Sequence, residues 1–151
     1  MDLIAFINEA GIKPDKTKDQ FFLIDSQILD KEAELLQLKE NDVALEIGAG
    51  FGSLTIRLTQ KCKVLAAEID PKLCDFLRRI KNVVAMNNDV IKILEEARRD
   101  GRTGAFNKVA GNIPYSRTQD ILLELLRHPW QRAALCVQKE FAEKLLDRKE
   151  K

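Results

Sequence analysis

The chain has 151 residues, of which 45% are apolar and 32% are charged, and its formal net charge is +1. This length suits one domain with a substantial core, and the composition is that of an ordinary globular protein. The small net charge does not by itself indicate a nucleic-acid-binding protein, and no apolar run approaches the roughly 20 residues needed to cross a bilayer.

The first 36 residues predict a helical arm ahead of the main sheet. Apolar residues at positions 3, 4, 6 and 7 suggest a short helix. After a polar stretch, Asp25 is a suitable N-cap for a second helix that runs to about Leu36. The N-terminus, Met1-Asp2-Leu3-Ile4, has an early acid and no basic leader, so we expect no secretory signal and a cytoplasmic protein.

Five short and nearly continuous apolar runs predict strands that are covered on both faces. The runs are Val43–Ile47, Val64–Ile69, Val83–Met86, Lys108–Gly111 and Ala133–Val137. Helical patterns alternate with them. This alternation predicts an α/β fold with a mainly parallel, doubly wound sheet, in a single domain over residues 1–151.

Four helices are expected between these strands. They are marked by Leu54–Leu58, Asp70-Pro71, Ile91–Arg99 and Ile121–Leu126. Asp70 reads as a helix cap followed by proline at the first helical position. The fourth helix is expected to open at Ser116 with a capping box to Gln119 and to stop near Pro129.

The cysteines and the histidine do not suggest a metal site. Cys62, Cys74 and Cys136 show no C-x-x-C pairing and no neighbouring histidines, so reduced thiols are expected. The only histidine, His128, precedes Pro129 at a helix end and is expected at the surface or as a C-cap. A single histidine in that position disfavours hydrolase triads.

A glycine-rich turn, Glu46-Ile47-Gly48-Ala49-Gly50-Phe51-Gly52, follows the first strand directly. Glycine permits a sharp turn and the close approach of a ligand, and the helix N-terminus behind it favours an anionic group. A nicotinamide-binding G-x-G-x-x-G loop would need glycine or alanine at Ser53, whereas the spacing here is E-x-G-x-G-x-G. This favours S-adenosylmethionine, which has no pyrophosphate. The alternative is that the glycines only make a tight turn.

Carboxylates follow the next two strands at the same predicted sheet edge. Glu68 lies twenty residues after Gly48, the spacing at which an acid meets ribose hydroxyls. Asp89 follows the third strand. Their positions support a cofactor site over the simple turn.

The tetrapeptide Asn112-Ile113-Pro114-Tyr115 follows the fourth strand. It offers an amide oxygen, a backbone carbonyl that we expect to stand outside the helix hydrogen bonds, and a flat aromatic face. Together these groups suit the exocyclic amine of a nucleobase, with the base stacked on Tyr115. The alternative for Tyr115 is a core aromatic packed beneath the helix.

Taken together, these motifs resemble the ribosomal RNA adenine dimethyltransferase family, which includes the macrolide-resistance rRNA methyltransferases. The resemblance is carried by Gln20–Asp25, Glu46–Gly52, Glu68, Asp89, Asn112–Tyr115 and Gln138–Ala142. It implies a Rossmann-like methyltransferase fold and S-adenosylmethionine-dependent dimethylation of N6 of adenosines in small-subunit rRNA. The implied partner is that rRNA or a pre-ribosomal particle.

The resemblance also implies roles for individual residues. The cofactor would contact Phe21, Leu23, Gly48, Gly50, Glu68, Asp89 and Asn112. Glu68 would bind the ribose and Asp89 the adenine amine, while Asn112 would lie between cofactor and target base. Asn112, Pro114 and Tyr115 would be the catalytic residues. Phe22 is a candidate for the second face of the base, or it simply covers the sheet.

The chain departs from the family pattern in two places. Position 21 is usually Asn or His, and Phe21 cannot donate or accept a side-chain hydrogen bond. Family members also continue through two more strands and a helical lobe, whereas this sequence stops at Lys151, inside the helix expected after the fifth strand, so it is either a fragment of a longer protein or a shortened relative. We therefore expect the strand at 133–137 to form an apolar edge that promotes self-association.

Two other functions remain open. The first is a non-catalytic module that binds S-adenosylmethionine and RNA during ribosome assembly. The second is amino-methylation of DNA or of protein glutamine, where N-P-P-Y-type tetrapeptides recur, although Ile113 and the segment Gln20–Leu23 argue against it.

Overall fold

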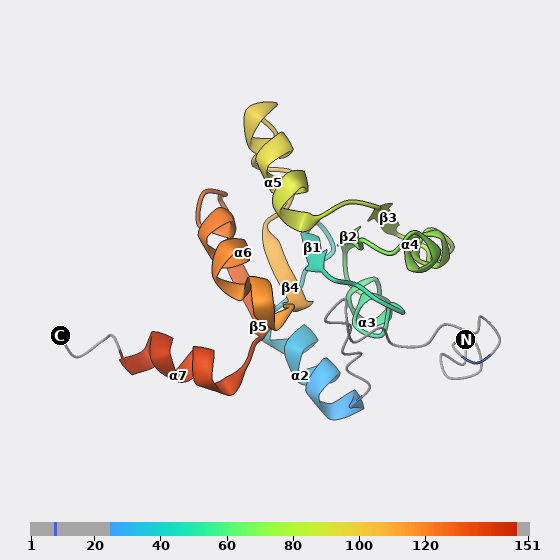
Figure 1. Cartoon of the computed structure of the whole chain (residues 1–151). Helices are drawn as coiled ribbons and strands as arrows, with labels where there is room; N and C mark the ends of the chain where they lie inside the picture. The colour runs from blue at the N-terminus through green and yellow to red at the C-terminus, as the bar shows by residue number, and fades with distance from the viewer. Residues whose placement is uncertain (1–7, 9–24, 148–151) are drawn as a thin grey trace.

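The computed structural model describes Asn8 and residues 25–147 (Figure 1). The short helix expected near residue 4 and the segment 20–24 lie outside the described residues. The elements are α2 (Ser26–Leu35), β1 (Val43–Ile47), α3 (Thr55–Leu58), β2 (Lys63–Ala67), α4 (Pro71–Leu77), β3 (Val83–Met86), α5 (Val90–Arg99), β4 (Lys108–Asn112), the 3₁₀ turn η2 (Tyr115–Arg117), α6 (Thr118–Leu125), β5 (Arg132–Cys136) and α7 (Lys139–Asp147).

The five strands form one parallel sheet in the order β3-β2-β1-β4-β5. The predicted doubly wound α/β sheet is therefore confirmed. The direction of winding changes between β1 and β4, and ligands of such sheets bind at this switch point, outside the carboxyl ends of the strands. The register aligns Ile47 of β1 with Ala67 of β2 and with Gly111 of β4. The loops that follow these strands consequently meet at one edge.

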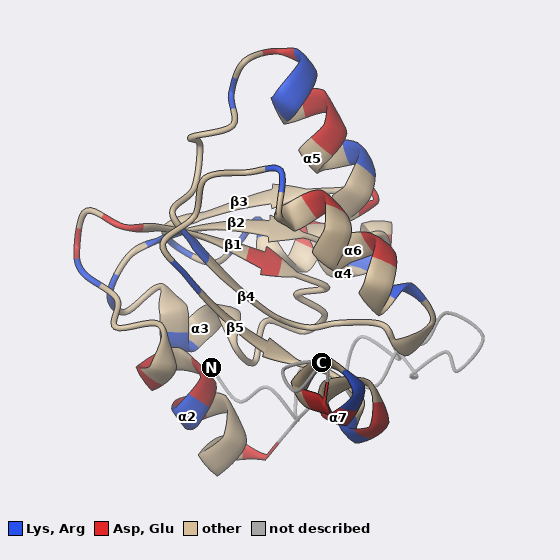
Figure 2. Cartoon of the chain, turned by 90° about the vertical axis from the view of Figure 1, so that its left-hand side faces the viewer, with Lys and Arg blue, Asp and Glu red and all other residues tan. Residues whose placement is uncertain are grey.

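Helices cover both faces of the sheet (Figure 2). Leucines of α2, α3 and α4, such as Leu29, Leu58 and Leu77, pack in one cluster against one face. Leu94 of α5 and Leu125 of α6 belong to a second cluster on the other face. The strands are thus buried between two apolar layers, which explains their continuous apolar sequences.

Two helix starts behave as predicted and one does not. Asp25 caps α2 by accepting the N–H of Gln27, and Asp70 caps α4 in the same way. The capping box expected at Ser116 is wrong. The chain first makes the η2 turn, so that α6 starts at Thr118, and its N-cap is Arg117, without a side-chain cap bond.

Asn107 joins β1 and β4 at the amino-terminal end of the sheet. Its side-chain oxygen accepts the N–H of Val43 at 2.9 Å, and its Nδ2 donates to Asp42 at 2.8 Å. These contacts link residues about 65 positions apart in the chain. They hold the two central strands together at the end opposite the loops.

His128 is not a surface residue, so that expectation is wrong. Its side chain is fully buried and its ring stacks on Phe106, with centroids 5.8 Å apart. Neither ring nitrogen has a hydrogen-bond partner among the described residues, although Nε2 lies 3.7 Å from a carboxyl oxygen of Glu124. The contact with Phe106, 22 positions earlier in the chain, accounts for the burial of His128, whereas the position before Pro129 only indicated a helix end.

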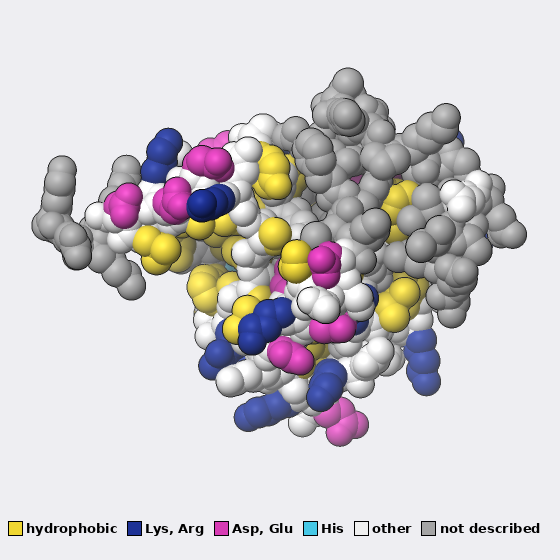
Figure 3. All heavy atoms as spheres, turned by 90° about the horizontal axis from the view of Figure 1, so that it is seen from below, with side chains coloured by type: hydrophobic (Ala, Val, Ile, Leu, Met, Phe, Trp, Pro, Cys, Tyr) yellow, Lys and Arg dark blue, Asp and Glu magenta, His cyan; other side chains and the backbone are white. Residues whose placement is uncertain are grey.

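The β5 side of the sheet is open in the described part of the chain, where β5 pairs only with β4. A groove beside it is lined by Gln27, Ile28, Lys31, Glu32, Leu35, Ala134, Leu135 and Cys136. The neighbouring α7 buries no residue and exposes Leu145 and Leu146. Figure 3 shows apolar side chains along this projecting helix. No helix within residues 25–147 is long and apolar enough to span a membrane.

Candidate active site

The glycine turn after β1 is tied to the end of β2. Gly48 and Gly50 have φ angles of +65° and +56°, a region that L side chains rarely adopt. The N–H groups of Gly48 and Ala49 both donate to the carbonyl of Ala67, at 3.0 and 3.2 Å. The turn therefore lies at the carboxyl edge of the sheet, as the sequence predicts.

Glu68 organises this turn. One carboxyl oxygen accepts the N–H of Gly50 at 2.8 Å, and the other accepts the N–H of Asp70 at 2.9 Å. Burial raises the pKa of the Glu68 carboxyl, and the two amide donors oppose that shift. Each carboxylate oxygen has a second lone pair, so Glu68 retains acceptor capacity towards the adjoining cavity. Its structural role in the loop was not foreseen from spacing.

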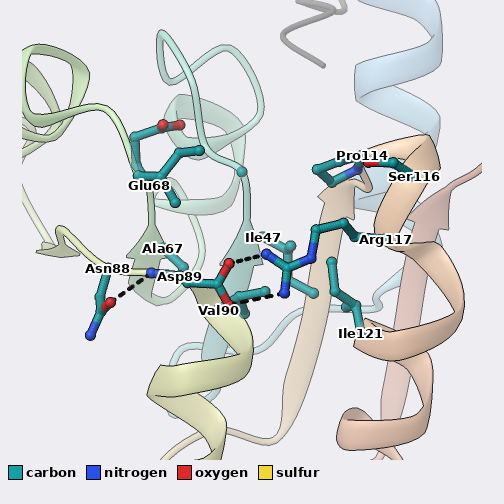
Figure 4. Close-up of a pocket in the computed structure, with 12 residues that line it drawn as sticks. Ile47, Ala67, Glu68, Asn88, Asp89, Val90, Pro114, Ser116, Arg117 and Ile121 are labelled. Atoms are coloured by element: carbon teal, nitrogen blue, oxygen red, sulfur yellow. Dashed lines mark hydrogen bonds and ion pairs between the residues drawn. The ribbon is translucent and has the colours of Figure 1, made fainter. Parts of the chain in front are cut away.

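Asp89 caps α5 and pairs with Arg117. Its Oδ1 accepts the N–H of Ile91 at 2.9 Å, and the guanidinium of Arg117 binds both carboxyl oxygens, with Nη2 at 3.4 Å from Oδ1 (Figure 4). Burial would raise the pKa of Asp89, but the hydrogen bond and charge of Arg117, together with the backbone N–H groups of Ile91 and Lys92, hold that pKa below its usual value. Sequence reasoning missed Arg117, since nothing local pairs it with a residue 28 positions away.

A cavity of about 260 Å³ lies between these groups. Glu68 stands on one side, Asp89 and Arg117 on the other, and Pro114 beyond them (Figure 4). Its lining is Ile47, Gly48, Ala67, Glu68, Ile69, Asn88, Asp89, Val90, Pro114, Ser116, Arg117 and Ile121. Two carboxylates separated by apolar side chains suit a nucleoside, because its hydroxyl and amine donors are separated by a flat ring. The residues present therefore fit the nucleoside part of S-adenosylmethionine.

The tetrapeptide at 112–115 adjoins this cavity. Asn112 ends β4, and the N–H of Ile113 donates to Cys136 at 3.0 Å, which fixes the chain just after it. A Cβ placed on Gly48 would lie 3.5 Å from the Asn112 carbonyl, so the two loops are in contact. Tyr115 is 45% exposed, which excludes the alternative of a core aromatic.

The carbonyl of Pro114 does not stand outside the helix hydrogen bonds, so that expectation is wrong. It accepts the N–H of Arg117 at 3.0 Å and the hydroxyl of Thr118 at 3.2 Å. The η2 turn brings both donors back onto it. The Thr118 hydroxyl also lies 3.4 Å from the Tyr115 carbonyl, which gives it a second acceptor.

Two buried acids lie beneath these loops. Glu46 accepts the hydroxyl of Thr55 at 2.6 Å, and burial raises its pKa to about 8. Glu32 accepts the N–H of Gly111 at 3.0 Å, and burial raises its pKa to about 7. The signal for Glu32 was in the sequence, because it shares the core-facing stripe of α2 with Leu29 and Leu36.

The remaining predicted site residues, Phe21, Phe22 and Leu23, lie outside the described residues. Within the described part of the chain no group of three or more potential metal ligands occurs, and Cys62, Cys74 and Cys136 are all free thiols.

Comparison with known proteins gives one consistent result. Residues 13–151 match the family model described as ribosomal RNA adenine dimethylase. Over 148 residues the chain is 34% identical to a probable ribosomal RNA small subunit methyltransferase A of Thermococcus gammatolerans, covering 95% of this chain and 50% of that protein. A protein of the same description from Methanosarcina barkeri is 37% identical over 135 residues, covering 86% and 44%.

Solved structures agree. A dimethyladenosine transferase from Plasmodium falciparum has a TM-score of 0.71 and 28% identity, covering 83% of this chain and 46% of that one. The 23S rRNA methyltransferase ErmE has a TM-score of 0.68 and 27% identity, covering 85% and 52%. The chain spans about half the length of the curated relatives it matches. Its sheet is that of a Rossmann-like methyltransferase, and the chain belongs to the ribosomal RNA adenine dimethylase family.

Proposed function

We propose that this chain forms the cofactor-binding and catalytic part of an S-adenosylmethionine-dependent enzyme that methylates, and dimethylates, N6 of adenosines in small-subunit rRNA. Its partner would be that rRNA or a pre-ribosomal particle in the cytoplasm. The observation that carries the proposal is the contact between the Gly48 turn and the Asn112–Tyr115 segment beside a cavity walled by Glu68 and Asp89.

In this proposal, Glu68 accepts hydrogen bonds from the ribose hydroxyls and Asp89 accepts one from the adenine amine. The methionine part would pass beside Gly48, where the absence of a side chain leaves the backbone accessible next to the Asn112 carbonyl. Phe21 and Leu23 would also contact that part. When bound, the cofactor supplies an electrophilic methyl group on a sulfonium.

Asn112 would act on the target base. An adenine amine is a poor nucleophile because its lone pair is delocalised into the ring. Acceptance of its N–H by the Asn112 side-chain oxygen favours a pyramidal nitrogen whose lone pair points at the methyl group. The amine proton leaves to water after transfer, so the main contribution of the protein is orientation.

Pro114 and Tyr115 would complete the base site. The Pro114 carbonyl can accept the second amine hydrogen when the Thr118 hydroxyl moves to its other acceptor at Tyr115. The half-exposed Tyr115 ring can stack on the base, with Phe22 on its other face.

Incubation with labelled S-adenosylmethionine and under-methylated small subunits tests the proposal. Label should appear on adenosine N6 with the wild type and disappear with Asn112→Ala. Asn41→Ala, at an exposed asparagine remote from the cavity, is the matched control and should transfer normally. Cofactor binding without transfer would instead indicate a non-catalytic binding module, and the absence of both would refute the proposal.

A further inference from the structure

Glu32 is a buried acid that the proposed chemistry does not use. It lies on the core-facing side of α2, and its Oε1 accepts the N–H of Gly111, 79 positions away, at 3.0 Å. Gly111 directly precedes Asn112. We propose that Glu32 is a positioning residue, whose carboxyl group holds the Gly111 amide and thereby sets the direction of the Asn112 side chain. This inference deepens the proposed function and rests on it for its effect on rate.

The backbone at Gly111 is closely packed, so a change there passes to its neighbours. A Cβ on Gly111 would lie 2.4 Å from the Ile47 carbonyl oxygen and 2.9 Å from the Ile47 nitrogen. Ile47 in turn leads into Gly48, where an added Cβ would lie 3.5 Å from the Asn112 carbonyl. Glu32 therefore binds the backbone where the Gly48 turn and the Asn112–Tyr115 segment meet. Close packing there leaves β1 and β4 little room to shift independently of each other.

The carboxyl group of Glu32 is only partly satisfied. Its Oε2 is buried and has no hydrogen-bond partner among the described residues. Burial raises the pKa of Glu32 to about 7, while the Gly111 bond opposes that shift. An ionised carboxylate accepts an amide hydrogen more strongly than a neutral carboxylic acid does. The hold on Gly111 should therefore strengthen as the pH rises through 7.

The ionisable groups around Glu32 come from each neighbouring element. On β1, buried Glu46 interacts with Glu32 electrostatically, and the negative charge of Glu32 adds to the burial that raises the pKa of Glu46. On β5, burial raises the pKa of the Cys136 thiol and the charge of Glu32 adds to it. On α3, Arg57 is bound to Asp30. Lys31 of α2 lines the adjacent groove.

No cation pairs with Glu32 in the described part of the chain. The negative charge of an ionised Glu32 is therefore not offset by a paired cation there, and it adds to the burial that raises the pKa of Glu46.

Glu32→Gln tests the inference, because glutamine keeps the side-chain acceptor but cannot ionise. In ¹H–¹⁵N spectra of the wild type, the Gly111 amide shift should titrate near pH 7, and in Glu32→Gln it should stay flat. The kcat of the wild type should rise about fivefold relative to that of Glu32→Gln across the same range, with little change in KM. Glu34→Gln, at an exposed acid on the same helix, should behave as the wild type.

Two results would overturn the inference. One is a Gly111 shift that does not titrate. The other is a ratio of wild-type to Glu32→Gln kcat that stays constant with pH, as a merely structural role would give. A wild type that binds cofactor but never transfers a methyl group would refute the proposed function instead. Glu32 would then be judged on the Gly111 shift and on the pH dependence of S-adenosylhomocysteine binding, with Glu32→Gln again the comparison.

Discussion

Arg117 binds the carboxylate of Asp89, which is proposed to accept a hydrogen bond from the adenine amine of the cofactor. Both oxygens of Asp89 interact with the guanidinium, and Oδ1 also caps α5. A carboxylate with three donors has little acceptor capacity left for a fourth. We therefore expect Arg117 and the adenine amine to compete for Asp89.

The strength of this competition follows from exposure. The side chains of Arg117 and Asp89 are 42% and 22% exposed, so solvent screens the ion pair. The pair should therefore oppose binding of the adenine amine by at most about 1 kcal/mol. Arg117→Gln, which removes the charge, should bind S-adenosylhomocysteine up to about fivefold more tightly in calorimetry. Added salt should strengthen wild-type binding by screening the ion pair, and it should not strengthen binding by the variant.

Arg127→Gln is the matched control. Arg127, which follows the end of α6, pairs with Glu124 and does not line the cavity. Removing the charge of Arg127 should therefore leave the affinity for S-adenosylhomocysteine unchanged. Equal or weaker binding by Arg117→Gln would refute the reasoning. It would mean that the guanidinium supports the nucleoside rather than competing with it.

Three further predictions concern stability and assembly. The folded-state pKa of Glu46, about 8, lies above its ordinary value of 4.5, so the stabilisation it gives is complete below pH 4.5 and is lost as the pH rises through 8. Urea unfolding should show the wild type losing stability over that interval by on the order of 5 kcal/mol, whereas Glu46→Gln should show a flatter profile. Gly111→Ala forces a Cβ onto backbone atoms and should lower the free energy of unfolding by about 3 kcal/mol or more. Gly101→Ala, at a positive φ but in open space, should lower it by only about 1 kcal/mol, and equal melting temperatures of the two variants would contradict this prediction. The β5 edge, which is open among the described residues, and its groove should make this chain self-associate in light scattering. Leu35→Glu in that groove should reduce association, whereas Leu126→Glu at the C-cap of α6 should not, and a monomeric wild type at high concentration would count against the prediction.

The sequence predicted the sheet and the loop positions well, because both follow from local patterns. Continuous apolar runs identified all five strands to within a residue or two. The glycines and the acids after the strands then had to meet at one edge, since parallel strands share a direction. The caps at Asp25 and Asp70 were readable for the same reason, as each bonds to its own next turn.

What the sequence did not predict depends on contacts between distant segments. The pairing of Arg117 with Asp89, the hold of Glu32 on Gly111 and the burial of His128 against Phe106 each join residues more than 20 positions apart. The Pro114 carbonyl was misjudged because a 3₁₀ turn, rather than a capped α-helix, follows it. Local patterns do not distinguish these two starts.

The hydrogen bonds of the Asn107 side chain to Val43 and Asp42 link the formation of the site to the pairing of β1 with β4. β4 lies next to β1 although β2 and β3 come between them in the sequence, and Val43 and Asn107 are 64 positions apart, so the cavity depends on non-local pairing. A ligand that recognises the cavity binds only chains in which this pairing is complete, and it stabilises them by mass action. Cofactor supply would thereby act on the lifetime of the folded enzyme as well as on its turnover, and a partly assembled sheet would not withdraw cofactor from the pool.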